Sequence, residues 1–236
     1  MLQILAIFGI SWLIVWLYDR SNLSILGLRP TPNRSKLAAI LFIQTAICYA
    51  LSFLLRIFLV KEQYTLNGDL SFENAGLAVW ETVRGSITEE MLCRGVLLYI
   101  LIRKLGNTRA IILSSFIFGL MHWINVGVFG NVIEMSITFV FTFSMGLLLA
   151  YSYIRTLSIL IPFAINLGWN LTQNFIFPEG QYGTHLFVFA FPPPMIVVSY
   201  PAFFFMQLFP KVAAIGLAYL LVKNFESIPL KPSTGQ

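Results

Sequence analysis

Residues 85–98 read GSITEEMLCRGVLL, and they place Glu89, Glu90 and Arg94 inside a run that is otherwise apolar. The chain around this stretch is strongly hydrophobic. Of its 236 residues 58% are hydrophobic and 11% are charged, which is less than half of the roughly 25% charged residues of soluble proteins. A mean hydropathy of +0.80 excludes an ordinary soluble domain and a disordered chain. The sequence therefore predicts an integral membrane protein whose few buried charges need an explanation.

A spanning helix takes about 20 apolar residues, within a range of roughly 17 to 25, and the sequence has seven candidate segments. They are 2–18, 37–60, 76–105, 109–124, 132–154, 158–177 and 195–222. The last segment contains Pro201, Pro210 and Lys211, so it is either one kinked helix or a short re-entrant piece followed by a span. We expect an all-α polytopic membrane bundle of about seven transmembrane helices, or eight if the last segment is divided. It would form a single integral membrane domain over residues 1–236.

The basic residues predict how this bundle is oriented. Most of them fall in alternate loops, in 20–36, 103–109 and 155 and in the tail from 223, while the other loops carry little more than Lys61. Short cytoplasmic loops are enriched in Lys and Arg. We therefore expect the N-terminus outside and the C-terminus in the cytoplasm, in a bacterial plasma membrane. The net charge of +5 forms no patch for nucleic acid, so no nucleic-acid partner is expected.

Among the charged residues of 85–98, Glu90 and Arg94 can form an ion pair, which leaves Glu89 without a partner on its own helix. A charge near the bilayer centre costs about 2.5–3.5 kcal/mol on insertion scales, so it marks a functional site by default. Glu90 and Arg94 are four residues apart, the favourable order for an ion pair on one helix. Glu89 is turned away from Glu90 by about 100°. A free carboxyl in an apolar pocket suits a general base or acid. The alternative is that all three residues form an interhelical clamp.

Two other predicted helices carry polar residues that could act together with Glu89. His122 ends the fourth segment, one turn after Phe118, although a lone helical histidine is often a packing residue. Asn166 and Asn170 share a face of the sixth segment, where amides either bridge helices or donate hydrogen bonds to an oxyanion. Such groups fit activation of water and stabilisation of a tetrahedral intermediate. The chain has no H-E-x-x-H motif, so neither a metal nor another cofactor is expected.

Two of these stretches resemble the motifs of a known family. EEMLCR at 89–94 matches EExxxR, and FGLMH at 118–122 matches FxxxH. Their order on successive membrane helices resembles the CPBP family of CAAX proteases and bacteriocin-processing proteins, also called Abi, over a core of about 76–177. The resemblance implies an intramembrane glutamic endopeptidase. Glu89 would activate the attacking water with help from His122, and Glu90 and Arg94 would brace the helix.

The third motif of the family is usually HxxxN, and here residues 166–170 read NLGWN. Asn170 matches the motif, whereas Asn166 stands where a histidine is usual. Asparagine can donate a hydrogen bond but cannot exchange a proton near neutral pH. Asn166 can replace the histidine if that residue is an oxyanion donor. If the histidine carries protons, the chain is slow or inactive, unless His185 folds back to supply an imidazole.

Three classes of function follow from these residues. The leading one is a membrane peptidase, with a peptide or a prenylated or otherwise lipidated peptide as substrate and membrane lipid around it. The second is a catalytically altered scaffold, either a structural subunit of a larger membrane complex or a bacteriocin self-immunity protein. The third is proton-linked transport, which is disfavoured because the sequence shows no paired halves with matching broken helices.

Overall fold

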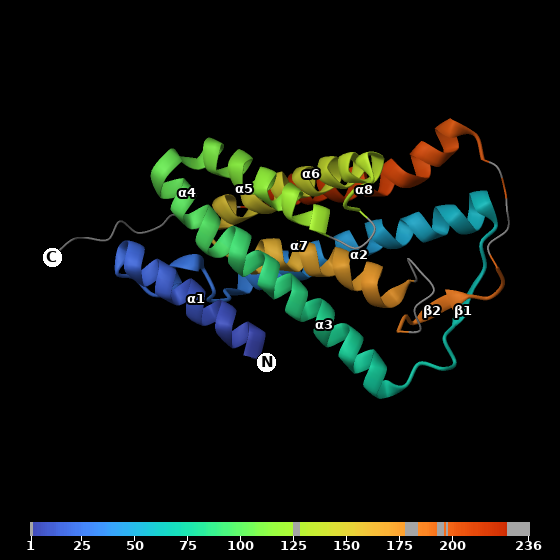
Figure 1. Ribbon diagram of the computed structural model, residues 1–236, viewed down its shortest axis with the longest axis horizontal. Helices are drawn as coiled ribbons and strands as arrows, with labels where there is room; N and C mark the ends of the chain where they lie inside the picture. The colour runs from blue at the N-terminus through green and yellow to red at the C-terminus, as the bar shows by residue number, and fades with distance from the viewer. Residues whose placement is uncertain (1, 125–127, 178–183, 193–195, 197, 226–236) are drawn as a thin grey trace.

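The computed structural model describes residues 2–124, 128–177, 184–192, 196 and 198–225, and these form a helical bundle with a small sheet at one end (Figure 1). Seven helical rods follow the seven predicted segments. The rods are α1 (Leu2–Asp19), α2 (Pro32–Val60), α3 (Phe72–Glu90) continued by η2 (Met91–Leu97) and α4 (Leu98–Leu105), α5 (Asn107–Met121) with η3 (His122–Ile124), α6 (Val132–Thr156), α7 (Leu160–Leu171) with η4 (Thr172–Ile176), and α8 (Tyr200–Lys223). The fold is therefore the all-α membrane bundle that the hydropathy predicts.

Four of the described helices, α1, α2, α6 and α8, have the length and hydropathy of a membrane span. The rod α3–α4 is long enough but carries the charges of the opening stretch, and α5 and α7 are shorter, with 15 and 12 residues. The last rod is a single helix with Pro210 inside it. The predicted start of that segment at Met195 lies outside the described residues.

Two helices begin earlier than their hydropathy predicts, because polar caps start them. The hydropathy predicts a loop over residues 20–36, yet α2 begins at Pro32. The side chain of Thr31 accepts a hydrogen bond from the backbone N–H of Arg34, and proline is well suited to the first helical position. Ser71 caps α3 in the same way through the backbone N–H of Asn74. Caps are polar, so a hydropathy window misses them.

Helix α7 is the central rod of the bundle, packed against α2, α3 and α6. Gly168 lets it approach α2 closely, because a Cβ there would lie only 2.3 Å from the Phe42 carbonyl oxygen. Thr45 Oγ1 of α2 donates to the Ile165 carbonyl at 3.1 Å. The buried Trp169 ring meets Tyr49 edge-on, with the ring centroids 4.7 Å apart. These contacts hold one face of α7 against α2 and turn Asn166 and Asn170 toward α3.

One end of the bundle is closed by β1 (Tyr64–Leu66) and β2 (Phe187–Phe189), an antiparallel pair with Thr65 opposite Val188. Glu62 ties this sheet to the end of α2. Its buried carboxylate binds Arg56 Nε at 2.8 Å and accepts a hydrogen bond from the Tyr64 hydroxyl. Burial and this hydrogen bond raise the pKa of Tyr64 well above its usual value.

The basic loops meet at the opposite end of the bundle (Figure 1). Arg34 Nη2 donates to the Thr156 carbonyl at 2.8 Å, and Arg155 Nη2 donates to the Lys223 carbonyl at 3.4 Å. A short 3₁₀ helix, η1 (Leu23–Leu26), joins the same cluster through the Ile159 N–H, which donates to the Leu26 carbonyl. The loops that the sequence groups on one side of the membrane are therefore neighbours in space. Their assignment to the cytoplasm stays a prediction.

Candidate active site

The opening stretch lies where the third rod changes its helical form. Glu89 and Glu90 occupy the last turn of α3, and Arg94 lies in η2, which is a π-helical segment of seven residues. Such wide turns inside α-helices occur frequently at functional sites. Glu90 and Arg94 still form the expected ion pair across this change, with Oε1 and Nη1 3.2 Å apart.

This ion pair is fully buried and joins the third rod to its neighbours. Glu90 is 0% exposed and Arg94 is 1% exposed. The Arg94 guanidinium lies over the Phe118 ring of α5, 3.9 Å from its centroid, a distance at which a cation and an aromatic face attract each other. Glu90 Oε2 and Arg94 Nη2 have no hydrogen-bond partner among the described residues. Each member of the pair depends on the other for charge compensation, because few other polar groups reach them.

Asn166 connects both glutamates to α7. Its amide nitrogen lies 2.9 Å from Glu89 Oε2 and 2.9 Å from Glu90 Oε1, so each of its two N–H groups has a carboxylate acceptor. Asn170 completes the chain of hydrogen bonds, since its amide donates to Asn166 Oδ1 at 3.0 Å and to Ser86 Oγ at 3.3 Å. An oxyanion role for Asn166 therefore requires one of its present hydrogen bonds to break.

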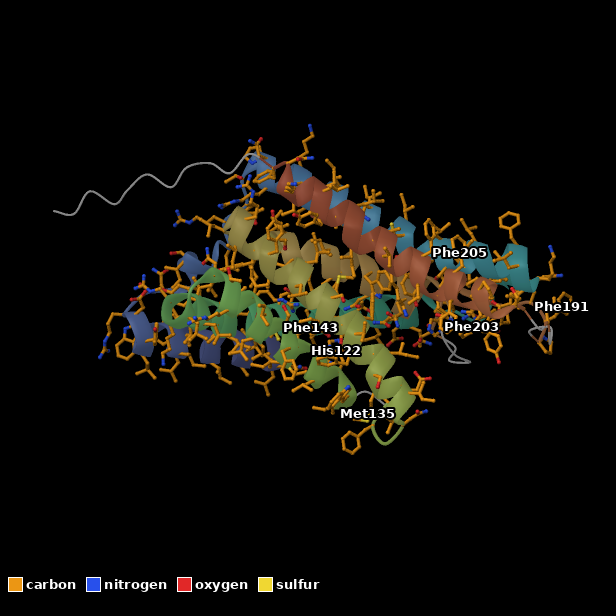
Figure 2. All side chains as sticks on the ribbon, turned by 90° about the horizontal axis from the view of Figure 1, so that it is seen from above. His122, Met135, Phe143, Phe191, Phe203 and Phe205 are labelled. Carbon is orange, nitrogen blue, oxygen red and sulfur yellow. The ribbon has the colours of Figure 1, made fainter. Side chains whose placement is uncertain are left out.

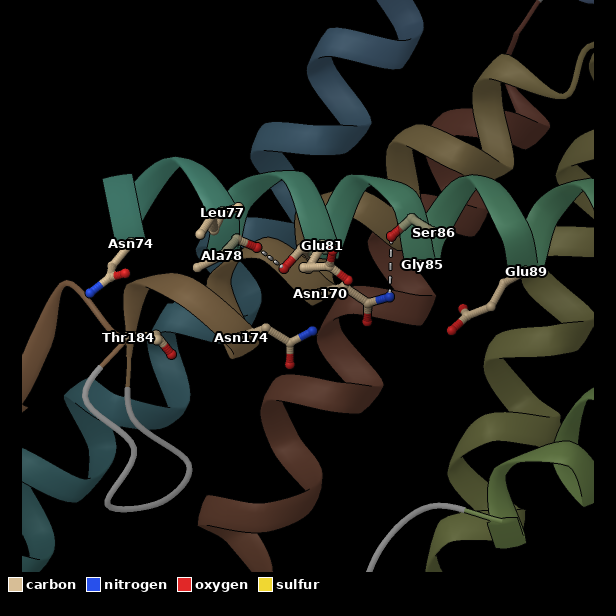
Figure 3. Close-up of a pocket in the computed structure, with 11 residues that line it drawn as sticks. Asn74, Leu77, Ala78, Glu81, Gly85, Ser86, Glu89, Asn170, Asn174 and Thr184 are labelled. Atoms are coloured by element: carbon tan, nitrogen blue, oxygen red, sulfur yellow. Dashed lines mark hydrogen bonds between the residues drawn. The ribbon is translucent and has the colours of Figure 1, made fainter. Parts of the chain in front are cut away.

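The two glutamates differ in what they face. Glu89 is half-buried and lines a cavity of about 450 Å³ between α3 and the α7–η4 rod, whereas Glu90 is not part of that lining. Figure 3 shows Glu89 and Asn170 projecting toward this cavity from the two facing rods, with the Ser86–Asn170 hydrogen bond between them. Asn74 and Thr184 lie at the far end of the same cavity. Glu89 is therefore the carboxylate of the pair that an incoming molecule can reach.

His122 lies at the end of α5, near the turn toward α6 (Figure 2). Its Nδ1 is 2.8 Å from the Phe118 carbonyl oxygen, and its ring packs against the Phe118 ring with the centroids 4.5 Å apart. A carbonyl only accepts hydrogen bonds, so Nδ1 carries the proton and Nε2 of the neutral ring is left as an acceptor. No described hydrogen bond joins His122 to Glu89 or Asn166. Its link to the carboxylates runs through Phe118 and Arg94.

The structure thus brings five of the singled-out residues together: Glu89, Glu90, Arg94, Asn166 and Asn170. The sequence analysis does not single out Ser86, the partner of Asn170, or Glu81, which also lines the cavity. The periodicity of α3 could have found both, because 81, 82, 85, 86 and 89 share a helical face. His185 is buried beside β2 and does not line the cavity, although its neighbour Thr184 does. Among the described residues, no three His, Cys, Asp or Glu side chains gather as metal ligands.

The buried ion pair of Glu90 and Arg94, with the half-buried carboxylate of Glu89 beside it, defines an intramembrane polar site in a bundle of apolar helices. Comparison with known families identifies the class of protein more closely. Residues 72–172 match the family model described as type II CAAX prenyl endopeptidase Rce1-like. This match supports the resemblance drawn from the motifs, and the matched segment includes Glu89, Glu90, Arg94, His122, Asn166 and Asn170. No curated protein and no solved structure matched the chain.

Proposed function

We propose that the chain is an intramembrane endopeptidase in which Glu89 activates water. The observation that carries the proposal is that the two adjacent glutamates have different surroundings. Glu90 is buried and paired with Arg94, while Glu89 faces the cavity. The family match supports a CAAX-type membrane endopeptidase fold. The substrate is a peptide, with or without a lipid, that reaches the cavity between α3 and α7.

In this mechanism Glu89 accepts a proton from a water molecule, and the oxygen of that water attacks the scissile carbonyl carbon. The C–N bond then breaks, and the proton passes from Glu89 to the leaving nitrogen. Asn166 holds the Glu89 carboxylate in place, and Asn170 orients Asn166. His122 offers Nε2 as a second proton acceptor, because its Nδ1 is committed to the Phe118 carbonyl. The negative charge on the tetrahedral intermediate needs a donor, and the amides of Asn170 and Asn166 are candidates.

A second candidate function is a scaffold without turnover, either a subunit of a membrane complex or a self-immunity protein. One observation favours it. Both N–H groups of Asn166 are bound to the two carboxylates, and an amide cannot take the proton-carrying part that an imidazole would play at this position. In this case the same hydrogen bonds only hold α3 and α7 together.

Cleavage by the purified full-length chain decides between the two candidates. Quenched fluorescent peptides, prenylated and unprenylated, are incubated with wild type, with Glu89→Gln and with Glu73→Gln. Glu73 is exposed in the first turn of α3 and serves as a control for loss of one carboxylate from the same helix. The peptidase proposal expects turnover by wild type and Glu73→Gln but none by Glu89→Gln. Equal turnover by Glu89→Gln rules out Glu89 as the base, and no turnover by wild type on any peptide favours the scaffold.

A further inference from the structure

The cavity at Glu89 has the form of a groove along α3. Its lining residues on that helix run from Asn74 to Glu89, and neighbouring members of the set are one or three positions apart. Fifteen residues of α-helix rise by about 22 Å. An extended peptide advances by about 3.3 Å per residue, so the groove matches about six or seven residues of substrate.

The groove has a deep end and an outer end. Glu89 lies at the deep end, beside the buried ion pair, and Asn74 and Thr184 lie at the outer end, toward the sheet (Figures 1 and 3). Between them the wall offers neutral hydrogen-bonding groups, among them Ser86, Asn170 and Asn174. Hydroxyls and amides can bind the backbone N–H and C=O groups of an extended peptide whatever its sequence.

One charged side chain in the groove can select a sequence. Glu81 lines the groove two turns before Glu89, a rise of about 12 Å along the helix. Its ion-pair partner Arg84 is not part of the lining, and no described lining residue is Lys or Arg. Exposed ion pairs contribute only about 0–1 kcal/mol, so Arg84 does not prevent Glu81 from binding a second cation.

We propose that the groove takes an extended peptide, entering from the end near β1 and β2, with a basic side chain at Glu81. The 12 Å rise between Glu81 and Glu89 places this side chain about three to four residues from the cleaved bond. An acidic side chain or a terminal carboxylate at the same distance is repelled by Glu81. This inference rests on the proposed peptidase function, because it assumes that the bond to be cleaved lies at Glu89.

The test uses a quenched host peptide of about twelve Ala, Ser and Leu residues, long enough to fill the groove, in which one Lys, Gln or Glu is moved along the sequence. Wild type and three variants, Glu81→Gln, Arg84→Gln and Glu73→Gln, are compared, and mass spectrometry locates the cleaved bond. We expect the bond to move with Lys and kcat/KM to favour Lys over Gln by up to about fivefold, the range of an exposed ion pair. Glu81→Gln should lose this preference. Arg84→Gln and the control Glu73→Gln should keep it.

Two results overturn the proposal: a cleaved bond that does not follow Lys, or a preference for Glu, which would make Arg84 the recognising residue. If no peptide is cleaved, binding of the same labelled peptides is measured by fluorescence anisotropy. Binding that favours Lys and loses this preference in Glu81→Gln supports the groove as a peptide site and rejects only the peptidase function. Binding that is independent of Lys overturns the groove proposal itself.

Discussion

At the scale of single residues, two neighbouring glutamates acquire different surroundings because a helix turns by about 100° per residue. Glu90 points into the bundle, where Arg94 compensates its charge, and Glu89 points to the groove. Asn166 donates to both carboxylates. The Arg94 guanidinium and the Asn166 amide therefore stabilise two adjacent carboxylates inside an apolar protein.

Replacing the two glutamates should separate their roles. Glu90→Ala leaves Arg94 buried without its partner, and breaking a buried pair costs roughly 3–5 kcal/mol in the free energy of unfolding. Glu89→Gln should fold nearly as well as wild type, because the glutamine oxygen can still accept the hydrogen bond from Asn166. Thermal melting in detergent measures both variants. An equal loss of stability in the two would mean that both glutamates belong to one structural clamp.

Asn166 should matter for stability as well as for any activity. Asn166→Leu keeps the size of the side chain but removes the donors to both carboxylates, and each buried acceptor left unpaired costs about 1–3 kcal/mol. Asn166→His retains a donor and should lose less stability. If Asn166 also serves as an oxyanion donor, its replacement by Ala should lower the rate by about 10²–10³-fold. Melting and cleavage assays on the three variants check this, and a fully stable Asn166→Leu would contradict the bridging role.

At the scale of elements, the site depends on how closely α7 lies against α2. Gly168 is the contact point, since a Cβ there would lie 2.3 Å from the Phe42 carbonyl oxygen and 2.4 Å from Thr45 Oγ1. Backbone atoms of a helix cannot move aside as a flexible side chain does. The glycine in NLGWN therefore sets the position from which Asn166 and Asn170 reach α3.

Substituting Gly168 should disturb this packing. Gly168→Ala forces α2 and α7 apart and should lower the free energy of unfolding by about 1–3 kcal/mol, the usual cost of overpacking. Gly76→Ala in α3 is the matched control, because no atom lies within 4 Å of the added Cβ. Alanine is the better helix former by up to about 1 kcal/mol, so the control should be neutral or stabilised. A neutral Gly168→Ala in the same melting assay would show that the two helices can separate freely.

At the scale of the whole molecule, the two ends of the bundle differ in charge. The end where the basic loops meet carries Arg34, Arg103, Arg155 and Lys223. The opposite end carries the sheet, Glu62 and Asp69, and the outer end of the groove. If the basic loops are cytoplasmic, as the positive-inside rule predicts, the groove opens on the other side of the membrane.

Cysteine labelling in intact cells measures this orientation. Single cysteines at Ser35 and Gly68, in a chain without Cys48 and Cys93, lie at exposed positions at opposite ends of the bundle. A membrane-impermeant thiol reagent should label the Gly68 position from outside and should reach the Ser35 position only after the cells are opened. The opposite pattern would reverse the bundle and place the groove on the cytoplasmic side.

The sequence by itself determined the membrane class, the seven helical rods and the pairing of Glu90 with Arg94. Hydropathy and helical periodicity are local properties, and these features depend on residues close together in the chain. Only the tertiary structure decided that Asn166 donates to both glutamates, that Phe118 lies under Arg94, and that Glu81 shares a groove with Glu89. The first two join side chains on different helices, and the groove exists only where α3 faces α7. The position of α7 depends on one close contact at Gly168, which no local pattern reveals.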